Sequence, residues 1–390
     1  MIILACFWWF LSVYLIYCAV ENTRLFVKPP RIDRKRKKWP HVSILIPARN
    51  EAKRIGPCLK SLLEQDYPNY EILVLDDRST DDTFDLVQRC GKSDPLTRAA
   101  HLGRAPHRVK IFEGKALPEG WLGKPWACYQ LSLKARGEWL FFIDADTWHL
   151  PETLKRTVQM AEAGKAEALS LLTRQITRTW MEALVIPVMA FHLLAFFPAR
   201  LALKAKSRFS RFAGVSGQFI FIRRSVYQAF GGHQKVKNEV VEDLNLGKRL
   251  VLKGYRVVLG DGSDFSFCRM YTNAGEVWDG FSKNFFPAVG YSIPLFINAI
   301  VVLILGGILP FVVLMGCVKT PLFWPALVFS LVLWSIRLLQ AVQYRMSKWS
   351  VLFHPLGCFL FALIGLNSFR WYFWRGHGYW KGRRLLAPKF

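Results

Sequence analysis

Two aspartates that follow a strongly apolar stretch are the first residues of this sequence that could do chemistry. The stretch Trp139–Ile143 is followed directly by Asp144 and Asp146, which flank a single alanine. Two carboxylates about 5 Å apart repel each other by roughly 3 kcal/mol at an effective dielectric constant near 20, so a nearby cation is expected. A hard divalent ion such as Mg²⁺ or Mn²⁺ prefers such oxygen ligands. For this motif alone, capping of the helix that follows stays open as the alternative.

Other charged residues also lie where apolar or amphipathic segments begin or end. Asp76 and Asp77 end a second apolar stretch, and Glu242 and Asp243 open an amphipathic segment. Lys124 lies at the start of a predicted helix, where its ammonium and free backbone N–H groups could bind phosphate. Capping of a turn or a helix is the alternative role for the aspartates, and the two roles can coexist.

The elements that would position these residues alternate between strand and helix. Strands are predicted at 41–47, 70–77, 107–114 and 139–146, and helices at 48–66, 79–90, 123–136 and 150–164. The strands are apolar throughout, which is typical of a mainly parallel sheet covered by helices on both faces. Ligands of such sheets bind beyond the carboxyl ends of the strands. We therefore expect an α/β, Rossmann-like fold whose acidic motifs meet at one edge.

Several uncharged stretches indicate a membrane protein. The chain has 390 residues, is 52% hydrophobic and has a formal net charge of +25. Residues 1–20 carry no charge and can span a bilayer, and eight Lys and Arg residues follow before position 39. The positive-inside rule then places the following domain in the cytoplasm, and the basic run needs no nucleic-acid partner to explain it. The eight cysteines show no paired spacing, so neither a disulfide framework nor a zinc site is expected.

Five segments are predicted on this basis. They are an N-terminal transmembrane anchor (1–22), a basic linker (23–40), a cytoplasmic domain (41–285), C-terminal membrane segments (286–370) and a basic aromatic tail (371–390). Within the cytoplasmic domain, the apolar helix 180–203 is expected to lie in the membrane interface, with a core helix as the alternative. The basic residues expected to meet lipid headgroups there are Arg200, Lys204, Lys206, Arg208 and Arg211.

The C-terminal topology leaves a conflict. Three C-terminal spans would place the basic tail outside, against the positive-inside rule. Segment 285–318 contains Pro287, Pro294 and Pro310, so an interfacial start and a re-entrant hairpin are the alternatives to a full crossing there. We expect a cytoplasmic C-terminus.

As a set, the motifs resemble those of the family 2 glycosyltransferases. Their order over about residues 41–285 is P-A-x-N-E, D-D-x-S-x-D, G-K, D-A-D, G-x-x-G and E-D. The segments 120–128 and 268–286 and the apolar C-terminal part make the chain most similar to membrane-bound enzymes that glycosylate carotenoids, hopanoids and similar lipids. The resemblance implies the glycosyltransferase A fold, a nucleotide-sugar donor and transfer with inversion.

The resemblance also implies roles for individual residues. Asp243, with Glu242, corresponds to the catalytic base, and Asp146, with Asp144, to the ligands of Mg²⁺ or Mn²⁺. The residues assigned to the nucleotide sugar are Pro47, Ala48, Asn50, Glu51, Asp76, Asp77, Lys124, Asp144, Gly217, Gln218 and Lys283.

The function expected from the resemblance is transfer of a sugar, glucose from a UDP-linked donor, to a lipid or isoprenoid acceptor at the cell membrane. A processive polysaccharide synthase is the first alternative, but the Q-x-x-R-W motif of such enzymes is absent from 280–286. A non-catalytic membrane scaffold predicts loss of the acids, which are all present. A metal-dependent phosphatase leaves the P-A-R-N-E and E-D motifs unexplained. The sequence leaves the oligomeric state open.

Overall fold

The chain forms two compact units in a computed structural model that describes residues 1–33, 35–92, 109–204, 209–210, 213–316 and 319–386. The α/β unit comprises Phe26–Arg174 and Leu201–Met270, and the helical unit comprises Met1–Leu25, Gln175–Arg200 and Tyr271–Phe390. The predicted segment boundaries stay predictions. Among the basic residues considered above, Lys206, Arg208 and Arg211 lie outside the described residues, as do Arg34 of the linker and 387–390 of the tail.

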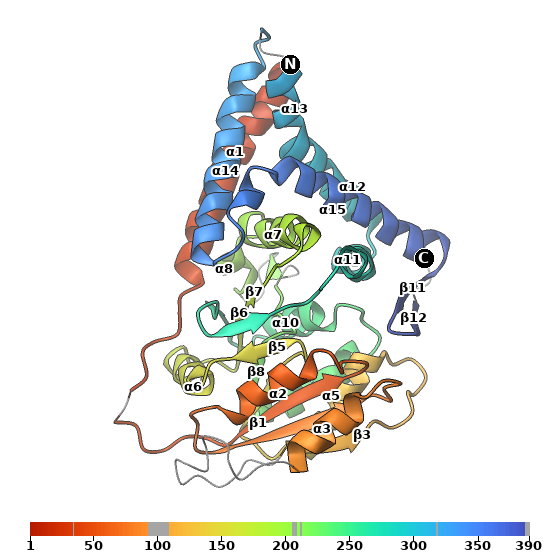
Figure 1. The fold of residues 1–390 in the computed structure, drawn as a ribbon. Helices are drawn as coiled ribbons and strands as arrows, with labels where there is room; N and C mark the ends of the chain where they lie inside the picture. The colour runs from red at the N-terminus through yellow and green to blue at the C-terminus, as the bar shows by residue number, and fades with distance from the viewer. Residues whose placement is uncertain (34, 93–108, 205–208, 211–212, 317–318, 387–390) are drawn as a thin grey trace. The chain divides into compact units, whose positions relative to one another are not determined.

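A seven-stranded sheet with the strand order β3-β2-β1-β4-β8-β6-β9 organises the α/β unit (Figure 1). Its strands are β1 (Val42–Ala48), β2 (Tyr70–Asp76), β3 (Val109–Glu113), β4 (Trp139–Phe142), β6 (Ala168–Leu172), β8 (Ile220–Arg223) and β9 (Val257–Asp261). Strand β8 pairs antiparallel with β4 and β6, and the other neighbours in the sheet are parallel. The prediction of an α/β fold with a mainly parallel sheet is confirmed.

Helices surround this sheet. They are α2 (Ile55–Leu63), α3 (Thr83–Lys92), α5 (Gly123–Lys134), α6 (Thr153–Ala163), α9 (Arg224–Phe230), the 3₁₀ helix η2 (Gly232–Val236) and α10 (Glu242–Leu252). The short helix α8 (Ala199–Ala202) contains the sequence boundary between the two units, which falls after Arg200. A second, small sheet has the order β5-β10-β7, with β5 (Thr147–His149), β10 (Ser266–Cys268) and β7 (Arg174–Gln175).

Two apolar cores explain why the strands read as continuous apolar stretches. Alternate side chains of a strand point to opposite faces of the sheet. Ile44 and Ile46 of β1 are fully buried in one core, which includes Leu59 of α2. Leu45 points to the other core, which includes Leu131 of α5. Because both faces are covered, apolar residues are favoured at every position of β1.

The parallel strands also bring the acidic motifs to one edge. Ala48 pairs in register with Asp76, and Leu45 pairs with Phe142 at the end of β4. The D-A-D motif follows β4 as a turn rather than extending the strand, and the Thr147 N–H donates to the Asp144 carbonyl over 3.2 Å. The predicted strand 139–146 therefore ends earlier than expected, because the backbone of the motif turns toward β5.

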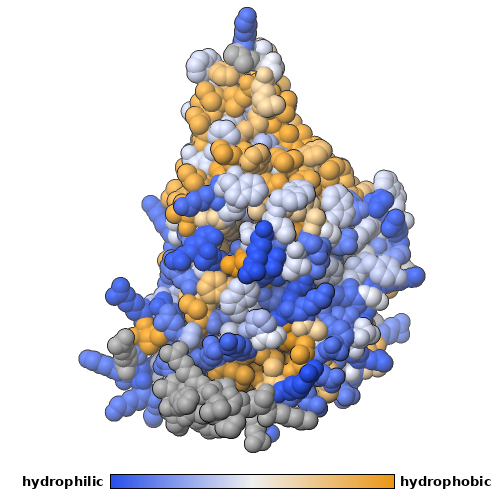
Figure 2. All heavy atoms as spheres, in the orientation of Figure 1, coloured by the Kyte–Doolittle hydropathy of each residue, from blue (hydrophilic) through white to orange (hydrophobic). Residues whose placement is uncertain are grey.

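The helical unit contains the apolar segments. Its elements are α1 (Ile2–Leu25), α7 (Trp180–Ala195), α11 (Ala274–Ala288), α12 (Ile293–Val302), the π-helix η3 (Leu303–Ile308), α13 (Leu309–Gly316), α14 (Phe323–Gln343), η4 (Trp349–Val351), α15 (His354–Phe369), the π-helix η5 (Arg370–Trp374), β11 (His377–Trp380) and β12 (Arg383–Leu386). Among the described residues, four helices are long and apolar enough to cross a membrane: Ile2–Leu25, Ile293–Gly316, Phe323–Gln343 and His354–Trp374. The expected N- and C-terminal apolar helices are thus present, and Figure 2 shows apolar residues gathered over α1, α13 and α14.

Helix α7, the predicted interfacial helix, belongs to the helical unit. Its start is fixed by a capping box, in which the Thr179 side chain accepts from the Glu182 N–H and the Glu182 carboxylate accepts from the Thr179 N–H. Most of its side chains, including Pro187 in its interior, are buried among the other helices of this unit. Its position in a membrane interface stays a prediction.

Candidate active site

Lys124 joins two of the predicted acidic motifs at the edge of the sheet. The lysine comes from the first turn of α5, and its Nζ lies 2.7 Å from Asp144 Oδ1 and 3.0 Å from Glu242 Oε1. Burial lowers the pKa of Lys124, but the carboxylates of Asp144 and Glu242 outweigh this effect and raise it well above its usual value. Burial raises the pKa of the Glu242 carboxyl, although the Lys124 charge opposes that shift. The site thus holds a stable ammonium between carboxylates.

Asp243 lies beside this group and has a fixed orientation. Its Oδ2 accepts from the Gly217 N–H over 2.7 Å, and its Oδ1 accepts from the Leu244 N–H over 2.8 Å. Gly217 comes from the turn before β8, and a Cβ there would lie 2.9 Å from Lys124 Nζ and 3.0 Å from Asp243 Oδ2. Only glycine therefore lets the turn approach both functional groups so closely.

Asp146 occupies a different environment, next to a thiol. The Cys268 Sγ of β10 donates to Asp146 Oδ1 over 3.5 Å. Burial raises the pKa of the Asp146 carboxyl, and the negative charges of Asp144 and Glu51 raise it further. A cation would relieve this repulsion, so the acidic oxygens suit a hard divalent ion.

The protein side chains available at this edge limit how a metal ion could be bound. Within the described part of the chain, no group of three or more His, Cys, Asp or Glu side chains could hold a metal by itself. A divalent cation shared between one or two carboxylates and phosphate oxygens of a substrate fits the residues present.

The loops after β1 and β2 are tied together by hydrogen bonds. Asn50 has a left-handed backbone with φ of 51°, and its side-chain oxygen accepts from the Thr80 N–H over 2.8 Å. The Asp77 N–H donates to the Ala48 carbonyl over 2.7 Å. The Asp76 Oδ2 accepts from the Ser79 N–H over 3.0 Å. The predicted residues of these two motifs are thus neighbours, and Asn50 holds the loops in place.

Asp76 also offers an unused acceptor. Its carboxylate is buried, with the residue 6% exposed, and Oδ1 has no hydrogen-bond partner within the described residues. An unsatisfied buried acceptor costs free energy unless a ligand supplies a donor. This oxygen is therefore available to a donor group of a bound ligand.

Three further predicted residues, Pro47, Glu51 and Gln218, lie next to residues of these motifs in the sequence. Pro47 lies in β1 next to Ala48, and Glu51 lies 3.5 Å from Arg54 across an ion pair. Gln218 follows Gly217 in the turn before β8 and accepts from the Thr173 hydroxyl.

Lys283 lies in the helical unit. Its ammonium lies 4.4 Å from the centre of the Trp380 ring, and its carbonyl accepts from the Tyr372 hydroxyl over 2.9 Å. The predicted contact of Lys283 with the nucleotide sugar stays a prediction.

Sequence reasoning missed Cys268 and Arg54 as neighbours of Asp146. Arg54 lowers the pKa of Asp146 and so partly offsets the carboxylates around it. Cys268 reaches the site because β10 pairs antiparallel with β5, where Cys268 lies opposite Thr147. Nothing in the sequence spacing relates Cys268 to Asp146, because Cys268 is a single cysteine far along the chain. Arg54 could have been predicted as a site residue, because it lies just after the P-A-R-N-E motif.

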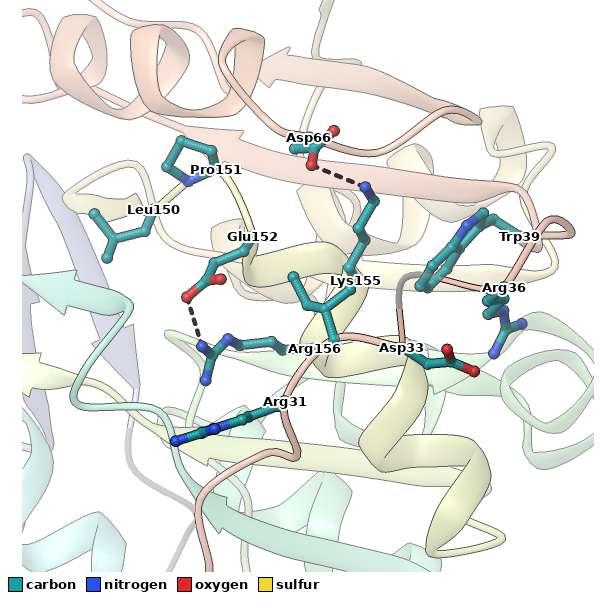
Figure 3. Close-up of a pocket in the computed structure, with 11 residues that line it drawn as sticks. Arg31, Asp33, Arg36, Trp39, Asp66, Leu150, Pro151, Glu152, Lys155 and Arg156 are labelled. Atoms are coloured by element: carbon teal, nitrogen blue, oxygen red, sulfur yellow. Dashed lines mark hydrogen bonds and ion pairs between the residues drawn. The ribbon is translucent and has the colours of Figure 1, made fainter.

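A separate cavity of about 870 Å³ lies away from the predicted site residues. Figure 3 shows Arg31, Asp33, Arg36 and Trp39 of the linker facing residues at the start of α6. Two ion pairs line the cavity, between Lys155 and Asp66 and between Arg156 and Glu152, each at 2.8 Å. None of the predicted site residues lines it.

Comparisons with known proteins concern the family and the fold of this chain. Residues 43–231 match the family model described as Glycosyl transferase family 2. The chain is 26% identical over 355 residues to a 4,4'-diaponeurosporenoate glycosyltransferase of Staphylococcus aureus (strain USA300), and the match covers 89% of each chain. The solved structure of the mannosyltransferase PcManGT from Pyrobaculum calidifontis, in complex with GDP-Man and Mn²⁺, is 17% identical, with a TM-score of 0.52 over 94% of this chain and 98% of that one. The structural likeness shows a shared fold.

Proposed function

Since this chain contains a family 2 glycosyltransferase domain, we propose that it transfers a sugar from a nucleotide sugar, with inversion, to a hydrophobic acceptor in the membrane. Two findings support this acceptor class. The chain is similar along most of its length to an enzyme whose name gives a carotenoid-type acceptor. The part of the chain that the structure describes also includes four helices that are long and apolar enough to cross a membrane.

The observation that carries the proposal is the group formed by Lys124, Asp144, Glu242 and Asp243. The two ion pairs of Lys124 hold its ammonium in one place beside the Asp243 carboxylate. This arrangement provides a base and a cation within one small site. Inversion by direct displacement needs both, and needs no covalent intermediate.

Asp243 is the proposed base. An acceptor oxygen attacks the anomeric carbon, its proton passes to Asp243, and the bond from that carbon to the diphosphate oxygen breaks. The electron pair of the broken bond leaves with the nucleoside diphosphate. General-base catalysis of this kind typically contributes about 10²–10⁴-fold. A carboxylic acid acceptor in apolar surroundings also needs a base, because burial raises its pKa.

Lys124 is proposed to stabilise the charge that develops on the leaving diphosphate. A fixed ammonium in a partly buried site needs little reorganisation when this charge appears. Asp146, with Asp144, would hold Mg²⁺ or Mn²⁺, which supplies further positive charge to the diphosphate when bound. The free acceptor atom of Asp76 is proposed to accept a hydrogen bond from the nucleobase, such as the N–H of a uracil ring.

A product analysis in membranes tests this function. Membranes carrying the full chain would be supplied with single nucleotide sugars, UDP-glucose first, and lipid extracts would be compared by mass spectrometry. We expect a lipid that is heavier by one sugar residue. The Asp144→Asn/Asp146→Asn double variant should not form it, whereas Asp85→Asn, which changes an exposed acid of α3, should.

Other products would identify other functions. A long water-soluble polymer would favour a processive synthase over transfer to a lipid. No product with any donor or membrane lipid extract, from protein that is folded and inserted, would favour a non-catalytic scaffold.

A further inference from the structure

We propose that α15 does not cross the membrane but lies along its cytoplasmic surface, so that the chain crosses three times and its C-terminus is cytoplasmic. This inference goes beyond the proposed function, because it concerns the topology of the helical unit alone. It rests on which ends of the apolar helices lie together.

The end of α15 lies beside the start of α12. The Phe286 N–H of α11 donates to Ser368 Oγ over 2.9 Å. The Asn367 side chain donates to Ser282 Oγ, also over 2.9 Å. The ring centres of Tyr291 and Tyr372 are 5.4 Å apart, and Tyr291 is two positions before Ile293, the first residue of α12. The last turns of α15 therefore lie on the side of the membrane from which α12 starts.

The start of α15 lies on that same side. The continuous helix Ile293–Gly316 has 24 residues and is about 36 Å long, which is enough to cross a hydrocarbon core of about 30 Å. Residues 317–322 are too few to cross, so Phe323–Gln343 must return to the starting side. Residues 344–353 include Arg345 and Lys348 and are also too few to cross. Both ends of α15 are therefore on one side.

The packing of α15 agrees with this position. Figure 1 shows α15 strongly inclined to α1 and α14, which run side by side. A Cβ at Gly357 would lie 2.8 Å from the Leu184 carbonyl of α7, and one at Gly365 would lie 3.0 Å from the Phe285 ring of α11. One face of α15 thus lies close against two other helices.

The opposite face of α15 is apolar and uncovered within the described residues. Leu356, Phe359 and Leu366 are 44%, 48% and 49% exposed. Their spacing places them on one side of the helix. The occupant of this face is the lipid of the cytoplasmic leaflet, because α15 belongs to the same compact unit as the helices that cross the bilayer. An apolar stripe of this kind buries itself at the boundary of headgroups and acyl chains.

The distribution of charge supports the same topology. With three crossings, the basic linker and the C-terminal basic residues all lie on the cytoplasmic side, as the positive-inside rule requires. Lys319 is the only Lys or Arg between the second and third crossing. The charge conflict thus disappears, and the segment that does not cross is α15 rather than 285–318. The basic residues after α14 on the cytoplasmic side are Arg345, Lys348, Arg370, Arg375, Lys381, Arg383, Arg384 and Lys389.

Cysteine labelling in the full chain tests the topology. Lys319→Cys and Arg384→Cys, both at exposed basic residues outside the catalytic machinery, would each be made in a cysteine-free chain that retains activity. A membrane-impermeant maleimide would be applied to spheroplasts before and after lysis. We expect Lys319→Cys to be labelled in intact spheroplasts and Arg384→Cys only after lysis.

Labelling of Arg384→Cys in intact spheroplasts, or protection of Lys319→Cys there, would overturn the proposal. Fusion of a reporter to the C-terminus of the full chain provides a second measurement if Arg384→Cys resists labelling even after lysis. A green fluorescent protein should then fluoresce and alkaline phosphatase should be inactive, and active phosphatase would equally overturn the proposal.

Discussion

The substitution Gly217→Ala should reduce catalysis while leaving the protein folded. A Cβ at this position would lie 2.9 Å from Lys124 Nζ and 3.0 Å from Asp243 Oδ2. Non-bonded heavy atoms with a carbon partner normally approach to about 3.5 Å, so each group must move by roughly 0.5 Å. Both atoms are at the ends of side chains, which can move without unfolding the chain.

The size of the effect follows from the geometry of the two groups. A misplacement of about 1 Å can cost about 100-fold in rate, so the smaller shift of both the base and the cation is expected to lower kcat by about 10- to 100-fold. The backbone N–H of residue 217 still donates to Asp243, so the loss comes from displacement and not from a missing hydrogen bond.

The assay is the initial rate of glycosylated lipid formation, with the thermal unfolding midpoint measured on the same samples. Gly56→Ala is the matched control, because a Cβ there meets nothing within 4 Å and alanine favours the helix α2. Wild-type kcat in Gly217→Ala, with Gly56→Ala also unchanged, would refute the placement of Lys124 and Asp243 in the catalytic site.

Three further predictions concern charge, metal and pH. Lys124→Met should lower kcat/KM by at least about 100-fold, since it removes the cation proposed to stabilise the diphosphate, and steady-state kinetics with a kcat/KM near wild type would contradict this role. Chelation of divalent ions should abolish transfer and added Mg²⁺ or Mn²⁺ should restore it, whereas full activity after dialysis against a chelator would exclude the metal. Burial lowers the pKa of His149 and of His233 to about 3. In the unfolded chain a histidine pKa of about 6.5 is expected. Between about pH 3 and about pH 6.5 the unfolded state therefore binds more protons than the folded state. The free energy of unfolding should therefore fall as the pH drops below about 6.5, by up to about 1.4 kcal/mol per pH unit for each histidine. The unfolding midpoint of the wild type should fall more steeply with decreasing pH than the midpoints of His149→Gln and His233→Gln. An equal pH dependence in all three proteins would count against buried neutral rings at these positions.

The fold was predictable because its strands are buried on both faces. Ile44, Leu45 and Ile46 read as one apolar run, and this pattern indicates a parallel sheet without further information. The edge that gathers Asp76 and Asp144 follows from the same topology. The antiparallel direction of β8 was not predicted, since a short apolar strand carries no sign of its direction.

The contacts inside the site were less predictable. Lys124 was assigned to phosphate, but its ion pairs with Asp144 and Glu242 join residues far apart in the sequence. The role of Asn50 in holding two loops together also depends on tertiary structure. The position of α15 shows a limit of hydropathy, because a helix that crosses a bilayer and one that lies on its surface can be equally apolar.

The most direct test of the account is the single-turnover rate of lipid glycosylation by Asp243→Asn at saturating nucleotide sugar. Asparagine keeps the shape of the side chain but only one of the two oxygens that accept from the Gly217 and Leu244 N–H groups. The unfolding midpoint and the donor affinity of this variant are therefore measured beside its rate. The account predicts a rate about 10²–10⁴-fold below that of the wild type, as expected for loss of a general base. A rate equal to that of the wild type would show that Asp243 is not the base, and would contradict the proposed mechanism.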